Sequence, residues 1–317
     1  MKKFIIRTLI FLAPILLIGV VLEVAMRNIP NDYNYKKQYL DENAGQIETL
    51  ILGSSETFRG VNPDYFSSIA FNVANNAQSL EYDYKILHKY KDDFKSLQTL
   101  IIPISYPSYY FDLKSSKGSK RIKSYNIYFG MASSFYLTDY SEVLSNKIKY
   151  TFRNFKKYYI NGNTLINCTS LGWTDYAEEN IPDLMESGEK AASAHSMNIH
   201  TDSAKQYFKE NLSYLESIIQ WASVNNVEVI LFTPPAYKSY TDLLDPEQLR
   251  ITVETSENMA SKYQNCVYFN MMVDANFNGE DFYDANHLSG IGAKKLSFIL
   301  DVQARLLKNN SEATIKF

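Results

Sequence analysis

The chain has 317 residues, of which 45% are hydrophobic, 14% aromatic and 21% charged, and its formal net charge at pH 7 is −3. This balance provides no global basic field, so the composition excludes nucleic acid as a general partner. Cys168 and Cys266 are compatible with a disulfide in an oxidising compartment, but two cysteines do not predict one. No cluster of cysteine and histidine indicates a metal site, and we expect no metal and no cofactor.

Residues 4–26 form an apolar run whose centre, residues 9–22, has no charge. A helix of this length reaches about 34 Å, which is enough to cross a bilayer. Lys2, Lys3 and Arg7 precede the run and Arg27 follows it, which predicts a cytoplasmic N-terminus with the rest of the chain outside. A cleaved signal peptide is the alternative, but no small-x-small cleavage site follows the run. We therefore expect a transmembrane anchor over residues 1–27 and a stalk over residues 28–48.

Short apolar strands and amphipathic helices alternate through much of the remaining chain. The predicted strands cover residues 49–53, 70–74, 97–104, 227–232 and 267–270, and the predicted helices cover residues 78–94, 203–222, 245–264 and 290–307. This order predicts an α/β domain over residues 49–317 with a doubly wound, five-stranded parallel sheet. Residues 105–202 interrupt the rhythm. We interpret them as a partly helical insertion near the mouth of the site, with a separate small domain as the alternative.

Two motifs fall at places where an open parallel sheet binds ligands, which is beyond the carboxyl ends of its strands. Gly53-Ser54-Ser55 follows the first predicted strand, and Asp284-Ala-Asn-His287 lies between the last predicted strand and the last predicted helix. An aspartate three residues before a histidine can orient the imidazole, whose other nitrogen then takes the proton of a serine hydroxyl. The pattern predicts Ser55 as nucleophile, His287 as base and Asp284 as the orienting carboxylate.

The same residues resemble a known family. Residues 50–63, Leu-Ile-Leu-Gly-Ser-Ser-Glu-Thr-Phe-Arg-Gly-Val-Asn-Pro, are similar to the first block of the SGNH (GDSL-type) hydrolases, with Gly-Ser-Ser in place of Gly-Asp-Ser. Asp284-Ala-Asn-His-Leu288 is similar to their last block. More narrowly, the chain resembles membrane-anchored SGNH-like proteins of bacterial cell-envelope polysaccharide O-acylation. The resemblance implies a flavodoxin-like fold and the same three catalytic residues.

The family's middle blocks supply an oxyanion hole from a glycine N–H and an asparagine side chain. Ala77 stands at the glycine position, and after the third strand Ser105 is the available donor in place of asparagine. Loss of one oxyanion donor typically costs on the order of 10²–10³ in rate. Two functions therefore stay open, a slow and specific enzyme or a catalytically degenerate, polysaccharide-binding subunit of an O-acylation complex.

The leading expectation is an extracytoplasmic serine esterase or O-acyltransferase on the bacterial inner membrane. Its expected substrates are acyl esters, with acetyl as the expected group, of a cell-envelope or exopolysaccharide. The resemblance also implies a membrane-bound O-acyltransferase as partner. Arg59, Tyr106 and Tyr109 are candidate substrate-binding residues, the tyrosines by stacking on sugar rings. A phospholipase is a third possibility, although no apolar acyl-binding stretch argues for it, and His195 and His200 are expected to be surface histidines.

Overall fold

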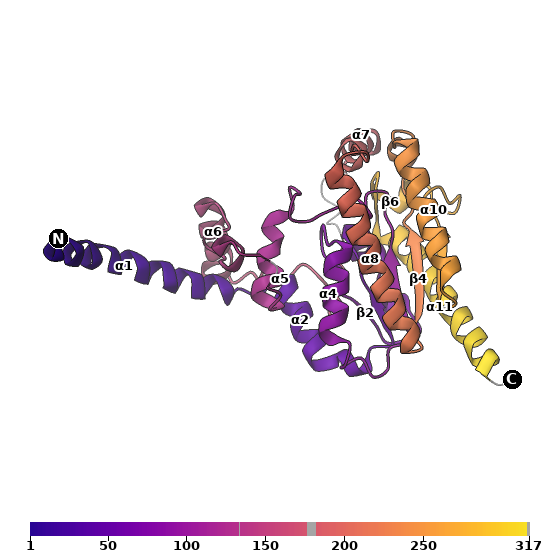
Figure 1. Ribbon diagram of the computed structural model, residues 1–317, viewed down its shortest axis with the longest axis horizontal. Coiled ribbons are helices and arrows are strands. Elements are labelled where there is room, and N and C mark those ends of the chain that lie inside the picture. Colours follow the sequence, from indigo (N-terminus) through magenta and orange to yellow (C-terminus); the bar gives the residue numbers. More distant parts are fainter. Residues whose placement is uncertain (133, 176–181, 316–317) are drawn as a thin grey trace. The chain divides into compact units, whose positions relative to one another are not determined.

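A computed structural model describes residues 1–132, 134–175 and 182–315, and the chain forms two compact units. Unit 1 comprises Met1–Gln38 and Lys117–Asn167, and unit 2 comprises Tyr39–Ser116 and Cys168–Phe317 (Figure 1). The stretch interpreted as an insertion, residues 105–202, therefore contributes its middle to unit 1 and both of its ends to unit 2. Residues 133 and 176–181 of that stretch lie outside the described residues.

Unit 2 is built on a five-stranded parallel sheet with the order β2-β1-β3-β4-β5. The strands are β1 (Thr49–Ile51), β2 (Ala70–Asn72), β3 (Thr99–Pro103), β4 (Glu228–Thr233) and β5 (Cys266–Asn270). Leu50 pairs with Phe71 on one side and with Leu100 on the other, and Ile101 pairs with Ile230. The strands are almost continuously apolar because both faces of a parallel sheet are covered. The predicted doubly wound α/β fold with five parallel strands is confirmed.

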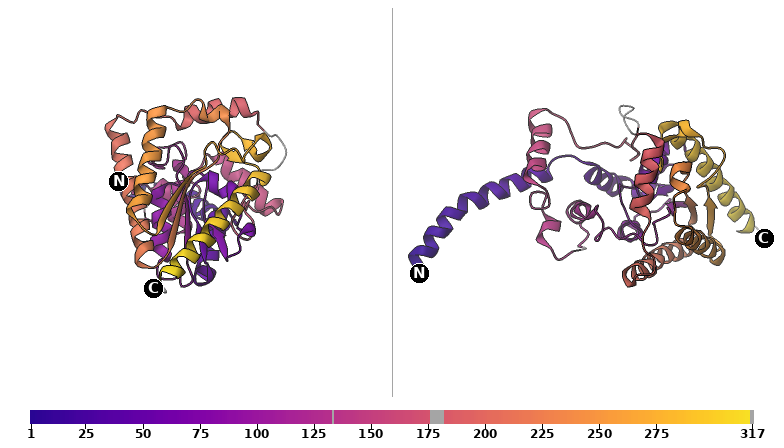
Figure 2. Two further views of the ribbon diagram at one scale, coloured as in Figure 1. Left: turned by 90° about the vertical axis from the view of Figure 1, so that its right-hand side faces the viewer. Right: turned by 90° about the horizontal axis from the view of Figure 1, so that it is seen from above.

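Helices cover both faces of this sheet (Figure 2, left). On one face lie α4 (Leu80–Tyr90), α8 (Asp202–Val224) and α10 (Pro246–Lys262), and on the other lie α3 (Ser55–Gly60) and α11 (Gly290–Ile315). The other helical elements that lie wholly in unit 2 are η1 (Ala44–Gln46), η2 (Pro63–Tyr65), α7 (Leu184–His195), α9 (Lys238–Thr241) and η6 (Gly279–Asp281). Ile51, Ile101 and Ile230 pack against Leu296 and Leu300 of α11 in one apolar cluster. This cluster fixes α11 against the strands whose carboxyl ends carry the site.

Unit 1 begins with α1 (Lys2–Arg27), which is long and apolar enough to cross a membrane, with a hydropathy of 2.7. The other elements are η3 (Ser119–Arg121), α5 (Ile122–Tyr128), η4 (Leu137–Tyr140), α6 (Ile148–Phe155), the π-helical turn η5 (Lys156–Ile160) and the first part of α2 (Asp32–Asn43). The segment expected as a stalk is therefore largely helical. The carboxylate of Glu23 accepts hydrogen bonds from the Ser141 hydroxyl (2.7 Å) and from the N–H groups of Glu142 and Val143 (3.0 Å each). The last turns of α1 thus belong to the folded part of unit 1.

Candidate active site

The turn after β1 presents Ser55 at the first position of α3. Gly53 has φ +111°, and a Cβ atom added there would lie 2.2 Å from Cγ of Pro103, so both the conformation and the space require glycine. The N–H of Gly53 donates to the carboxylate of Asp83 (2.8 Å), and its carbonyl accepts from the N–H of Asn75 (3.2 Å). The loop that carries Ser55 is therefore held from both sides.

Asp284 and His287 lie on a short antiparallel hairpin that the sequence pattern did not predict. Its strands are β6 (Phe282–Asp284) and β7 (His287–Leu288), and Asp284 pairs directly with His287 across the turn. Oδ1 of Asp284 also accepts the N–H groups of Asn286 (3.1 Å) and His287 (2.9 Å). Because the hairpin fixes the backbone of both residues, their side chains lose little conformational entropy when they form their hydrogen bond.

The three predicted catalytic side chains form one hydrogen-bonded series. Nδ1 of His287 lies 2.9 Å from Oδ1 of Asp284, and Nε2 lies 2.8 Å from Oγ of Ser55. An ionised carboxylate only accepts hydrogen bonds, so Nδ1 carries the proton and Nε2 of the neutral ring accepts from the Ser55 hydroxyl. Burial raises the pKa of Asp284. The hydrogen bond and the electrostatic effect of His287, together with two backbone N–H groups, lower this pKa by more, so the net shift is downward. Asp284 therefore stays ionised and fixes the histidine tautomer.

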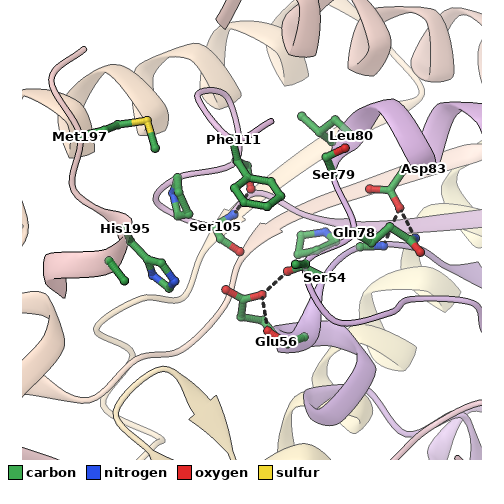
Figure 3. Close-up of a pocket in the computed structure, with 17 residues that line it drawn as sticks. Ser54, Glu56, Gln78, Ser79, Leu80, Asp83, Ser105, Phe111, His195 and Met197 are labelled. Atoms are coloured by element: carbon green, nitrogen blue, oxygen red, sulfur yellow. Dashed lines mark hydrogen bonds between the residues drawn. The ribbon is translucent and has the colours of Figure 1, made fainter. Parts of the chain in front are cut away.

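Ser55 opens onto a cavity of about 160 Å³, which we call the Ser55 cavity. Figure 3 shows its walls, with Ser54 beside Glu56 and with His195 opposite Leu80 and Asp83. Its lining residues are Gly53, Ser54, Ser55, Glu56, Ala77, Gln78, Ser79, Leu80, Asp83, Pro103, Ser105, Pro107, Ser108, Phe111, Ala194, His195 and Met197. Both ends of the 105–202 stretch contribute to it. The cavity thus combines apolar side chains with polar ones, among them five serines, and Ser55 is the serine that His287 contacts.

Ala77 and Ser105, the two expected oxyanion residues, both line the Ser55 cavity. Ala77 has φ +57°, a left-handed conformation that favours glycine, so the backbone keeps the shape expected of a glycine at a position filled by alanine. Oγ of Ser105 is buried and has no hydrogen-bond partner within the described part of the chain. A buried hydroxyl without a partner costs free energy, and it is available to donate to a ligand oxygen in the cavity.

Asp83 is a further carboxyl group in the cavity wall, and sequence reasoning missed it. It is buried on α4 and accepts from Nε2 of Gln78 (2.6 Å) as well as from Gly53. Burial raises its pKa to about 7, although these two hydrogen bonds lower it. A signal existed in the sequence, since Asp83 falls three residues after Leu80 on the apolar face of the predicted helix. Its hydrogen bond from Gly53 indicates that Asp83 supports the loop that carries Ser55.

His195, expected at the surface, lines the Ser55 cavity instead. It is half-buried at the end of α7, where its Nδ1 atom lies 2.9 Å from the hydroxyl of Tyr240. Burial lowers the pKa of His195 and His287 lowers it further, against the opposing effects of the carboxylates Glu56 and Asp284. Nothing in the local sequence distinguishes it from a surface histidine. His200 does lie exposed, 3.2 Å from a carboxylate oxygen of Glu247.

The tyrosines proposed to stack on sugar rings are core residues, which corrects that expectation. Tyr106 is 1% exposed and its hydroxyl accepts from the N–H of Asp245 (3.1 Å). Tyr109 is fully buried, with its hydroxyl 3.1 Å from Oγ of Ser256. Neither ring is open for stacking on a sugar, because residues of α10 and its N-cap help to enclose both, although Tyr106 does line a small pocket beside Glu56 and Ser105. Arg59, the third candidate for substrate binding, belongs to α3 but is not among the described residues that line the Ser55 cavity. Cys168 and Cys266 are both free thiols and form no disulfide with each other.

No protein-family model and no curated protein matches this chain. Among solved structures, it is similar to a protein described as a platelet activating factor from Streptococcus pneumonia, with 11% identity and a TM-score of 0.43 over 93% of this chain and 98% of that one. It is similar to a protein described as an acylhydrolase from Bacteroides fragilis, with 12% identity and a TM-score of 0.39 over 87% and 95% of the two chains. A GDSL-like lipase from Bacteroides thetaiotaomicron has 13% identity and a TM-score of 0.37 over 89% and 99%. At these identities the likeness concerns the fold alone.

Proposed function

We propose that the chain is a membrane-anchored, extracytoplasmic serine esterase or O-acyltransferase, with Ser55, His287 and Asp284 as its catalytic residues. The observation that supports this most directly is the hydrogen-bonded series of these three side chains, with distances of 2.8 Å and 2.9 Å, whose serine lines the Ser55 cavity. A serine hydroxyl is a weak nucleophile until a positioned base takes its proton. This arrangement supplies that base and a carboxylate that orients it.

In the proposed reaction, Oγ of Ser55 attacks the ester carbonyl while Nε2 of His287 takes the hydroxyl proton. The carbonyl oxygen becomes an oxyanion, which the backbone N–H groups of Ser55 and Ala77 and the hydroxyl of Ser105 stabilise. The C–O bond to the alcohol then breaks, and the alcohol leaves with the proton from His287. A water molecule or a sugar hydroxyl gives its own proton to His287 as it attacks the acyl-enzyme. That attack releases the acid or the new ester and restores Ser55.

The size and lining of the Ser55 cavity favour a short, uncharged acyl group. Leu80, Pro103, Pro107, Phe111 and Met197 provide an apolar wall, and the volume of about 160 Å³ has room for a small group. The Glu56 carboxylate lies 3.5 Å from Oγ of Ser55 and opposes a negatively charged acyl group. Acetyl, as carried by acylated cell-envelope polysaccharides, meets these requirements. We propose such a polysaccharide as substrate and a membrane-bound O-acyltransferase as acyl donor partner.

The adjacent serines provide a matched test of the nucleophile. The purified full-length chain in detergent is treated with a fluorophosphonate probe and, separately, with nitrophenyl acetate. Ser55→Ala should abolish labelling and nitrophenol release. Ser54→Ala should retain both, because Oγ of Ser54 donates to a carboxylate oxygen of Glu56, whereas Oγ of Ser55 lies 2.8 Å from Nε2 of His287. Equal loss in the two variants would count against Ser55.

The competing function is a catalytically degenerate subunit that binds polysaccharide. Serine in place of the oxyanion asparagine favours it, and the complete Ser55–His287–Asp284 series opposes it. If the wild-type chain neither reacts with the probe nor releases nitrophenol, while an acetylated polysaccharide still binds to it, the binding function replaces the enzymatic one.

A further inference from the structure

A second surface of the chain lies far from the Ser55 cavity in sequence and is exposed and apolar. Six large side chains of unit 1 are 57–105% exposed, namely Phe135, Tyr136, Leu137, Leu144, Ile148 and Phe152, and we call them the apolar patch. Isolated exposed apolar residues are ordinary, but a group of this size indicates contact with another apolar medium. The proposed catalytic reaction makes no use of these side chains.

The apolar patch is tied to the last turns of α1. The Arg27 side chain donates to the carbonyl of Tyr140, and Glu23 accepts from Ser141 and from two backbone N–H groups that follow it. The hydroxyl of Tyr159 donates to the carbonyl of Ala25 (2.9 Å), and α6 packs against α1. The segments that carry the patch residues therefore contact α1, and their hydrogen bonds fall on the turns at which its apolar part ends.

The point at which the apolar part of α1 ends corresponds to one surface of a membrane. Residues 4–22 rise about 28 Å as a helix, close to the thickness of a bilayer's hydrocarbon core. If α1 spans a bilayer, Glu23 lies at the boundary between hydrocarbon and headgroups. The patch residues held beside Glu23 and Arg27 then lie at the depth of the interface, where aromatic and apolar side chains are favoured.

The charge of the same segment fits a lipid headgroup layer. Residues 143–160 include five basic side chains and no acidic one. On α6, Ile148 and Phe152 lie one turn apart, while Lys149 and Arg153 lie one turn apart beside them and are exposed. A short helix with an apolar side next to a basic side is the pattern of helices that lie in the plane of a membrane surface. The basic side chains reach phosphate groups while the apolar ones enter the acyl region.

We propose that the apolar patch and the basic side chains of α6 form a membrane-interface surface that rests on the outer leaflet of an anionic bilayer around the end of α1. This inference goes beyond the proposed esterase or acyltransferase function and depends only on α1 as an anchor. It assigns residues 135–160 a binding role toward lipid headgroups and upper acyl chains. The surface would hold unit 1 flat against the bilayer and not merely tether it.

Depth-dependent quenching by brominated lipids tests the proposal on the full-length chain. The native Trp173 and Trp221 are first replaced by phenylalanine. In this background a single tryptophan is introduced as Phe152→Trp in the patch, Leu16→Trp in the middle of α1, or Val224→Trp as a control. Val224 is an equally apolar, 83% exposed residue at the end of α8 in unit 2. In phosphatidylglycerol–phosphatidylcholine proteoliposomes, lipids brominated near the headgroup should quench Phe152→Trp several-fold more than Val224→Trp. Lipids brominated deep in the chain should quench Leu16→Trp most.

A charge reversal separates headgroup attraction from apolar contact. Lys149→Glu with Arg153→Glu should reduce quenching of Phe152→Trp, and the reversal Lys205→Glu with Lys209→Glu, also one turn apart but on α8, should leave it unchanged. If Leu16→Trp is quenched and Phe152→Trp behaves as Val224→Trp does, the patch does not contact lipid and a protein partner is its occupant. If Leu16→Trp is not quenched either, α1 is no anchor and the proposal falls with it. Neither result bears on the reaction proposed at Ser55.

Discussion

Nε2 of His287 lies 2.8 Å from Oγ of Ser55, although 232 residues separate them in the chain. Two local devices bring them together. A glycine turn after β1 presents Ser55, and a two-residue hairpin turn locks His287 to Asp284. Because each device is rigid by itself, the long-range contact depends on how α11 and β1 pack rather than on flexible loops. A single substitution can therefore test either the glycine turn or the hairpin without changing the other.

Asp284→Asn tests the orientation of His287. Asparagine can still accept the N–H groups of residues 286 and 287, so the hairpin should survive with little change in thermal stability. The amide presents the wrong hydrogen-bond partner to Nδ1, and kcat for hydrolysis of an acetyl ester should fall about 10³–10⁴-fold. An activity close to that of the wild type would mean that Asp284 does not fix the histidine tautomer.

Ser105→Ala tests the buried hydroxyl as an oxyanion donor. We expect kcat to fall about 10²–10³-fold with little change in KM, because the hydroxyl acts on the transition state. Ser79→Ala is the matched control, since Ser79 lines the same cavity and its buried Oγ also has no hydrogen-bond partner among the residues that the structure describes. Similar losses in both variants would show that the cavity wall, and not Ser105 in particular, was disturbed.

Ala77→Gly tests the left-handed turn. Glycine adopts φ +57° without the steric cost that alanine bears, so the free energy of unfolding should rise by up to about 1 kcal/mol while activity is retained. Asn226 has φ +55°, and asparagine tolerates this region, so Asn226→Gly should give a smaller gain. A clear loss of stability in Ala77→Gly, measured by thermal unfolding in detergent, would contradict this explanation.

Asp83→Asn should change how stability depends on pH. The pKa of Asp83 is raised from 3.8 to about 7 in the folded chain, so the folded state binds this proton more tightly than the unfolded state. The stabilising contribution is complete below pH 3.8 and is lost as pH rises toward 7, with a slope of at most about 1.4 kcal/mol per pH unit.

In the Asp83→Asn variant this slope should disappear. The difference in free energy of unfolding between variant and wild type should therefore grow in favour of the variant from pH 4 to about pH 7 and then level off. Chemical unfolding across this range measures it, and the difference cancels the contributions of the other carboxyl groups. A difference that does not vary with pH would show that Asp83 is ionised throughout.

The sheet was predictable because its strands are short apolar runs, a pattern set by burial on both faces, and because glycine or proline marks the end of some of them. Thr49-Leu-Ile-Leu-Gly53 and Leu97 to Ile104 are examples. Ser55, Asp284 and His287 were predictable as a group because strand ends meet at one edge of a parallel sheet. The hairpin that carries two of them was missed, because its strands, Phe282–Asp284 and His287–Leu288, mix polar and apolar residues and form no apolar run.

The surroundings of the site were less predictable. Tyr106 and Tyr109 read as surface aromatics in a stretch without periodicity, yet α10 buries both. His195 reaches the Ser55 cavity only because α7 ends beside it. Such positions depend on tertiary packing between segments far apart in the chain, and residue type and spacing do not encode that packing locally. The proposed boundaries at residues 27, 48, 105 and 202 stay predictions.

The attachment of α1 to its own unit has a practical consequence for preparing the protein. Met26 is 3% exposed, and Glu23 receives three hydrogen bonds from residues 141–143. A secreted form that starts at residue 28, the boundary that hydropathy suggests, would leave an open apolar hole and three unpaired donors. Soluble versions should begin before Glu23 and replace only the apolar turns that precede it.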